Sequence, residues 1–197
     1  MNRIVVTALL VAACGGGERQ PTADPAPAEA SALGDCGLAG EVALSGRGIG
    51  ALLVGAPLDS VRSKCLVLAD SMSEDDEGNP LRRVWVAIRE DTVHAVVDSG
   101  RIWRIEISSS RLNTSDSLGV GSTIFELLAA GAATGAEGEE GLYVMLGKHC
   151  GVSFLLDTPI SDDAHRENWS QDQLARITGT ARVKRVLLSG CAQLSGA

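Results

Sequence analysis

The chain has 197 residues and a formal net charge of −8 at pH 7, from 17 Lys and Arg residues against 25 Asp and Glu residues. An acidic chain without a basic run is a poor binder of nucleic acid, so we expect no nucleic-acid partner. Aromatic residues make up only 3% of the chain, which limits the number of aromatic anchors that a binding surface could use.

The first fourteen residues predict an export signal rather than part of the fold. Arg3 supplies a positive start, and residues 4–13 form an apolar run that is too short to cross a bilayer. The run ends at Val11-Ala12-Ala13-Cys14, which resembles the lipobox of bacterial lipoproteins. The resemblance implies a signal peptide over 1–13 and a diacylated Cys14 that anchors the protein in the bacterial cell envelope, facing the periplasm, with the outer membrane favoured over the inner. An ordinary secretory signal with an incidental cysteine is the alternative.

The part after Cys14 divides into a linker and two halves. Residues 14–35 predict a flexible linker, because a triple glycine and a Pro/Ala stretch cannot bury a core. The remainder is long enough for a real core, and we divide it into a first half over 36–112 and a second half over 113–197.

Four further cysteines, Cys36, Cys65, Cys150 and Cys191, are an even number in an exported chain. Two disulfides are therefore predicted. Of the three possible pairings we prefer the one within halves, Cys36 with Cys65 and Cys150 with Cys191. No two of the four have the close spacing of a zinc half-site, so no zinc is expected.

The first half predicts a short strand over 41–45, a helix and an antiparallel meander. The helix runs from Pro57 to about Lys64 and places Cys65 on the buried face. A candidate strand over 66–69 and an acidic loop over 71–80 follow, and the carboxylates of that loop lack the alternate spacing of a calcium site. Three alternating runs then predict strands with turns at 90–91 and 98–100, and residues 103, 105 and 107 share a face in the third.

The second half predicts the same order of elements. A helix over 123–130 begins with Thr123 and Glu126 at capping-box spacing, and a Gly/Ala/Glu loop runs through 141. Strands are predicted over 142–146 and 150–155, with Cys150 facing inward beside Val152. An insertion over 157–173 with a short helix after 161–162 precedes a last strand over 177–189.

Two similarities indicate an internal duplication. Residues 181–189 match residues 100–108, with two arginines and the final serine coinciding. Both helix starts also share a glycine turn, a first helical residue and a pair of apolar residues: Gly55, Pro57, Leu58 and Val61, then Gly121, Thr123, Ile124 and Leu127. This tandem pattern resembles the β-lactamase-inhibitor-protein-like group, which includes small outer-membrane lipoproteins of the barrel-assembly machinery. The resemblance implies that this protein binds another protein.

The expected fold class is α+β, a tandem repeat of a short helix and an antiparallel β-meander, with the helices on one sheet face. The other face is then free to bind. Strand alternation places Trp85, His94, Arg104 and Glu106 on that face in the first half, and Arg185 in the second. Trp85, His94, Arg104 and Arg185 are the predicted binding residues.

Sequence motifs for catalysis are missing or incomplete. None of the three histidines lies in a catalytic motif, there is no nucleophile elbow, and the Gly-x-Gly pairs lack the rest of a dinucleotide fingerprint. We therefore expect no enzyme, no cofactor and no metal. The predicted function is a non-catalytic, membrane-anchored module that binds or scaffolds another envelope protein. An inhibitor or immunity factor against a periplasmic enzyme is the alternative, and a hydrolase is disfavoured.

Overall fold

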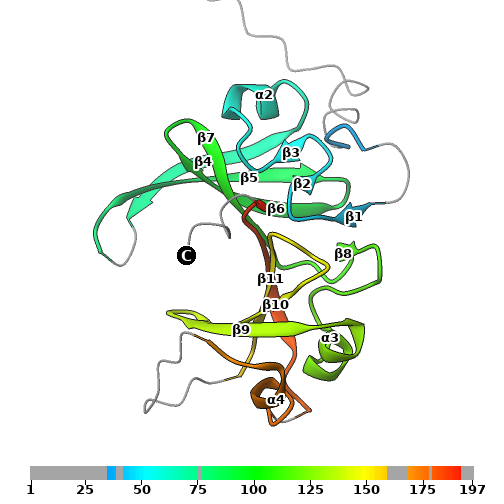
Figure 1. The fold of residues 1–197 in the computed structure, drawn as a ribbon. Coiled ribbons are helices and arrows are strands. Elements are labelled where there is room, and N and C mark those ends of the chain that lie inside the picture. Colours follow the sequence, from blue (N-terminus) through cyan, green and yellow to red (C-terminus); the bar gives the residue numbers. More distant parts are fainter. Residues whose placement is uncertain (1–34, 39–41, 75–76, 159–167, 178, 192–197) are drawn as a thin grey trace, which may run out of the picture.

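One antiparallel sheet of eight strands forms the centre of the computed structural model (Figure 1), which describes residues 35–38, 42–74, 77–158, 168–177 and 179–191. The strand order is β4-β5-β6-β7-β12-β11-β10-β9. In chain order these strands are β4 (Val67–Glu74), β5 (Pro80–Ile88), β6 (Asp91–Asp98), β7 (Arg101–Ile107), β9 (Ala133–Gly138), β10 (Gly141–Leu146), β11 (Val152–Leu156) and β12 (Val183–Leu188). The predicted signal peptide, Cys14 and nearly all of the linker lie outside the described residues.

The remaining elements are short. Two two-stranded pairs join β1 (Ala43–Leu44) to β8 (Asn113–Thr114) and β2 (Gly48–Ile49) to β3 (Leu52–Leu53). The helices of the described residues are α2 (Leu58–Arg62), α3 (Ile124–Ala130) and α4 (Gln171–Leu174). None of the helices in this part of the chain is long and apolar enough to cross a membrane.

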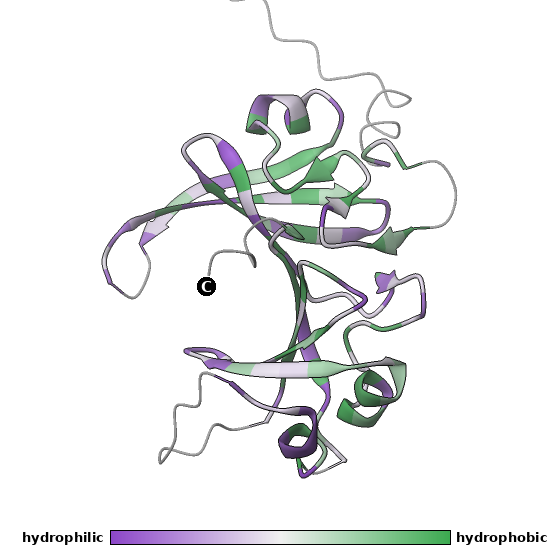
Figure 2. Ribbon diagram, viewed as in Figure 1, coloured by the Kyte–Doolittle hydropathy of each residue, from purple (hydrophilic) through white to green (hydrophobic). Residues whose placement is uncertain are grey.

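The sheet bends strongly, so it has a convex side and a concave side. The β4–β5 hairpin and the β9–β10 hairpin project toward the same side, whereas α2, α3 and the small strand pairs lie on the outside of the bend (Figure 1). Hydrophilic residues gather at the tips of both hairpins (Figure 2). The main core packs one face of the sheet against the outer elements and includes Leu58 and Val61 of α2, and Ile124 and Leu127 of α3.

The predicted fold class is wrong. The protein is mostly β, with one continuous eight-stranded sheet and, in the described residues, three helices of five, seven and four residues. A repeat of helix plus meander does not describe it, because β7 pairs directly with β12 and the strands merge into a single sheet. The short helices cover only parts of this sheet and do not form a second layer of comparable size.

The two glycine turns make equivalent hydrogen bonds to the sheet. Leu58 N donates to Gly100 O at 2.9 Å, and Ile124 N donates to Ala181 O at 3.1 Å. The guanidinium of Arg101 donates to Gly55 O at 2.7 Å, and that of Arg182 donates to Gly121 O at 2.8 Å. These contacts explain one of the two coinciding arginine positions, that of Arg101 and Arg182. The predicted capping box of Thr123 and Glu126 is confirmed at the start of α3.

One predicted loop is shorter than expected, and another is a strand. The acidic loop over 71–80 is shorter, because β4 continues to Glu74 and β5 begins at Pro80. As an edge strand with largely exposed side chains, β4 needs no apolar alternation. The Gly/Ala/Glu loop is β9, which pairs along its length with β10. Its Gly135 exchanges two backbone hydrogen bonds with Trp169, at 2.9 and 2.7 Å, so tertiary pairing overrides a composition of low β-propensity.

Both predicted disulfides are present, Cys36–Cys65 and Cys150–Cys191. Cys65 is buried as expected, and so is Cys36, at 1% and 0% exposure. The inward orientation predicted for Cys150 is wrong, since Cys150 lies in the turn before β11 and is exposed, as is Cys191. One disulfide is therefore part of the core and the other lies on the surface.

The predicted short helix after 161–162 lies outside the described residues. The helix observed nearby is α4, which begins after Ser170, where the Ser170 hydroxyl and the Gln173 side chain form a capping box. Leu174 of α4 is fully buried, and it packs close to Gly135, so that α4 and Trp169 cover the outer edge at β9.

Candidate protein-binding surface

A row of cross-strand partners crosses the concave face of the sheet through all eight strands. Its members, in strand order, are Ala69, Trp85, His94, Glu106, Leu187, Ser153, Met145 and Thr134. Side chains at directly opposite positions point to the same face. The four predicted binding residues lie in this row or two positions from it along a strand, so the register brings together residues that are far apart in the sequence.

An ion-pair network lies across the middle of this face. Glu106 is only 8% exposed, and its carboxylate accepts a hydrogen bond from Arg104 at 2.7 Å and lies 3.7 Å from the guanidinium of Arg185. Arg185 in turn donates to both carboxylate oxygens of Glu140, at 3.0 and 2.8 Å. The hydroxyl of Tyr143 also donates to Glu140, at 3.3 Å. The network therefore ties β7 and β12 to the tip of the β9–β10 hairpin.

His94 lies between this network and Trp85. The two rings meet edge to face, with centroids 5.4 Å apart. Burial lowers the pKa of His94 below its ordinary value; the charge of Glu106 opposes this, whereas Arg185 and Arg83 add to it. Trp85 is half-buried, so it is less accessible than a tryptophan on a fully free face would be.

Trp103 is the accessible aromatic residue at this face, and the sequence prediction placed it on the wrong side. It was expected to share the inward face of Ile105 and Ile107. Val96 pairs with Arg104 and Val97 pairs with Ile102, so Trp103 is the extra residue of a β-bulge. Ile102 takes the buried position, whereas Trp103 is 44% exposed and lies 5.2 Å from the Arg104 guanidinium in a cation–π contact. A prediction that assumes strict alternation of side chains along the strand cannot locate a bulge.

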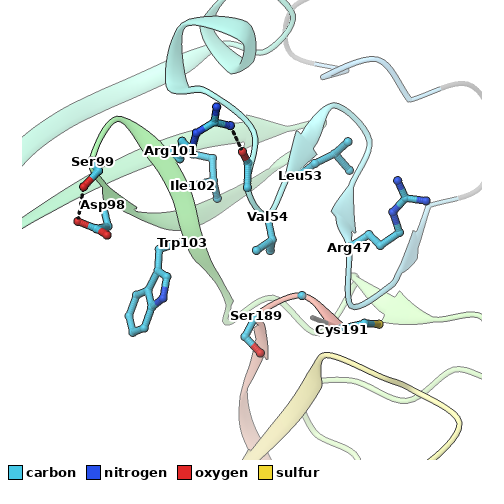
Figure 3. A pocket seen from close by; sticks show the side chains of 12 residues that line it. Arg47, Leu53, Val54, Asp98, Ser99, Arg101, Ile102, Trp103, Ser189 and Cys191 are labelled. Atoms are coloured by element: carbon cyan, nitrogen blue, oxygen red, sulfur yellow. Dashed lines mark hydrogen bonds between the residues drawn. The ribbon is translucent and has the colours of Figure 1, made fainter. Parts of the chain in front are cut away.

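Two hollows meet at Trp103. The apolar hollow has a volume of about 600 Å³ and lies where the turn after β3, the β6–β7 turn and the end of β12 come together. Trp103, Val54 and Ser189 surround it, with Arg47 and Cys191 on the side opposite Trp103 (Figure 3). Leu53 and Ile102 complete its apolar lining.

The polar hollow has a volume of about 670 Å³ and lies between the two projecting hairpins. Its lining combines two cations, four carboxylates and three large side chains: Arg83, Arg104, Glu74, Glu77, Glu139, Glu140, Leu81, Trp103 and Tyr143. Burial, and then the neighbouring Glu140, raise the pKa of Tyr143 from its ordinary value of 10.0 to about 12.

A separate polar cluster lies at the loop after β8 and has a structural role. The carboxylate of Asp116 accepts a hydrogen bond from the Thr114 hydroxyl at 2.6 Å, contacts Lys148, and lies 2.8 Å from Nε2 of His149. Burial raises the pKa of Asp116, but hydrogen bonds from Lys148 and Thr114, together with the electrostatic effect of His149, outweigh it and hold the pKa well below its ordinary value. The cluster fastens the loop to the turn before β11. In the described residues no group of three or more His, Cys, Asp or Glu side chains could hold a metal ion.

Comparison with known proteins gives a fold and no function. No protein-family model matches the chain, and no curated protein matches it. A solved structure that is similar is the crystal structure of the uncharacterized protein yfeY from Escherichia coli, with a TM-score of 0.50 and 17% sequence identity. The similarity covers 75% of this chain and 99% of that chain. At this identity the similarity shows the fold alone.

The two disulfides indicate an oxidising compartment outside the cytoplasm, because structural disulfides rarely persist in a reducing one. The disulfides and the fold together therefore describe an extracytoplasmic, mostly β protein with a curved sheet. The concave side of this sheet carries an ion-pair network and an exposed tryptophan.

Proposed function

We propose that this protein is a lipid-anchored protein of the bacterial cell envelope that binds another envelope protein through the concave face of its sheet, without catalysis. The observation that carries the proposal is the position of Trp103, a large exposed aromatic side chain between two hollows. Tryptophan is enriched among the residues that dominate binding energy, especially where it adjoins pockets that a partner can fill.

The environment of Trp103 supports this role. The ion-pair network holds Arg104 against Glu106 and Glu140 against Arg185, so these charged side chains are ordered before a partner arrives. A preorganised surface loses less side-chain entropy on association. The lipid anchor rests on the resemblance of residues 11–14 to a lipobox, and it would keep the binding face near other envelope proteins.

Photocrosslinking in the envelope tests the proposal. A photoreactive phenylalanine analogue in place of Trp103 should give a discrete crosslinked protein. The same analogue in place of Phe125 should not, since Phe125 is 56% exposed but lies on α3, on the outside of the bend. Crosslinking of the same protein from position 125 and not from position 103 would contradict the proposal.

Affinity for the crosslinked protein gives the second measurement. Trp103→Ala should weaken binding by at least about 2 kcal/mol, or roughly 30-fold, while the melting temperature changes little because the side chain is exposed. Phe125→Ala is the matched control and should leave the affinity unchanged. A crosslinked protein that is an enzyme and loses activity on binding would favour the inhibitor or immunity-factor alternative over a scaffold.

A further inference from the structure

The polar hollow contains a cation, Arg83, that has no ionic partner in the described part of the chain. Arg83 lies on β5 and lines the hollow half-buried, and within the described residues no carboxylate pairs with its guanidinium. Its Nε is buried and has no hydrogen-bond partner in this part of the chain, and the same is true of Nε of Arg104. A buried donor left unpaired costs free energy, so a small movement of either side chain that lets an acceptor from outside reach its guanidinium would recover part of that cost.

Arg82, the neighbouring arginine on β5, has an ionic partner within the protein, so it differs from Arg83. Arg82 faces the opposite side of β5, where its Nε and Nη2 donate to both carboxylate oxygens of Asp70 at 2.9 and 2.7 Å. Arg62 contacts the same carboxylate. One arginine of the pair is therefore fully engaged within the protein, whereas the adjacent one faces the hollow without a counter-ion among the residues that the structure describes.

The rims of the hollow have the opposite charge. Glu74 comes from the β4–β5 hairpin and Glu139 from the tip of the β9–β10 hairpin. Neither has a cationic partner among the described residues, whereas the adjacent Glu140 is engaged by Arg185. The hollow thus places Arg83, and Arg104 with its partner Glu106, between the carboxylates of Glu74 and Glu139.

We infer that the polar hollow binds a segment of the partner protein in which one acidic side chain is flanked on both sides by basic residues. The acidic side chain would accept hydrogen bonds from Arg83 and Arg104, and the basic residues would lie against Glu74 and Glu139. The inference rests on the proposed function and adds the chemistry of the partner to it. A second copy of this chain fits poorly, because a net charge of −8 and acidic rims would oppose each other.

A short peptide tests the charge pattern without knowledge of the natural partner. The probe is an acetylated and amidated Lys-Ser-Glu-Ser-Lys, titrated at millimolar concentration while the Nε–H signals of the arginines are followed by NMR. The Arg83 and Arg104 signals should shift and saturate. Replacing the central glutamate of the peptide by glutamine should weaken binding about tenfold, as expected for loss of a charge-assisted hydrogen bond. Replacing its two lysines by serine should also weaken it.

Variants of the protein test whether Arg83 contacts the glutamate of the peptide. With Arg83→Gln the glutamate and glutamine peptides should bind within about twofold of each other, because Arg83 supplies the unpaired charge, whereas Arg104 is already paired with Glu106. Arg82→Gln is the control and should retain the tenfold preference. Arg83→Lys keeps the charge and should retain part of it, which separates lost charge from a general disturbance of β5.

Two outcomes would overturn the inference. One is the absence of a saturable shift at Arg83, and the other is an equal response to the glutamate and glutamine peptides in the unaltered protein. Either result would leave the proposed function standing if position 103 still crosslinks to a partner. Absence of any crosslink from position 103 would instead count against the proposed function, whatever the peptides do.

Discussion

The two disulfides should differ in what they contribute to stability, in an order that loop length alone does not predict. The sequence separation is 29 residues for Cys36–Cys65 and 41 residues for Cys150–Cys191. In the chain-entropy model these loops correspond to about 3.6 and about 3.9 kcal/mol, so entropy ranks the second bond slightly higher.

The burial of Cys36 and Cys65 reverses the order of the two disulfides in their contribution to stability. Cys36 and Cys65 are 0% and 1% exposed, and both belong to the core, whereas Cys150 and Cys191 are exposed. Replacing both buried cysteines by alanine also removes two packed groups, at about 0.5–1.5 kcal/mol each if they behave like deleted methylenes. The Cys36→Ala/Cys65→Ala variant should therefore lose about 5–7 kcal/mol, and the Cys150→Ala/Cys191→Ala variant about 4 kcal/mol.

Urea denaturation of the two double variants measures this difference. A second measurement needs no mutation: in a mild thiol reductant the folded protein should lose the exposed bond first, as read by alkylation and mass spectrometry, because exchange requires access to a sulfur atom. A larger loss of stability in the Cys150→Ala/Cys191→Ala variant, or earlier reduction of Cys36–Cys65, would refute the reasoning from burial.

Three further predictions concern the anchor and the concave face. Cys14→Ala should move the protein from the detergent phase to the aqueous phase in phase partitioning, and unchanged partitioning would reject lipidation. Glu106→Gln should cost about 1–3 kcal/mol in urea denaturation because it leaves the half-buried Arg104 without its charged partner, whereas the exposed Glu139→Gln should stay within about 0.5 kcal/mol; equal effects would show that the network adds nothing. Because burial lowers the pKa of His94 in the folded state, its contribution to stability is present above the unfolded pKa of about 6.5 and is lost as the pH falls below it. The melting temperature should drop from pH 7 to pH 5 by less in His94→Gln, and an identical drop in both proteins would contradict this.

Local sequence signals determined the features that depend on neighbouring residues. The capping box at Thr123 and the buried position of Cys65 follow from helical spacing, and both are present. The alternating runs of β5, β6 and β7 form an antiparallel meander, as predicted. In each case the pattern and the contact lie within one element or between consecutive ones, where chain connectivity leaves few alternatives.

Only the tertiary structure decided how these parts combine. The direct pairing of β7 with β12 makes one sheet of eight strands, and pairing with β10 turns a Gly/Ala/Glu stretch into β9. The bulge in β7 places Trp103 outward, against the alternation of its strand. Arg82 is ion-paired, whereas Arg83 has no ionic partner among the described residues, and this difference depends on which elements approach each side of β5. These features arise from partners that are distant in the sequence, and a single chain read in order does not specify which distant residues will meet.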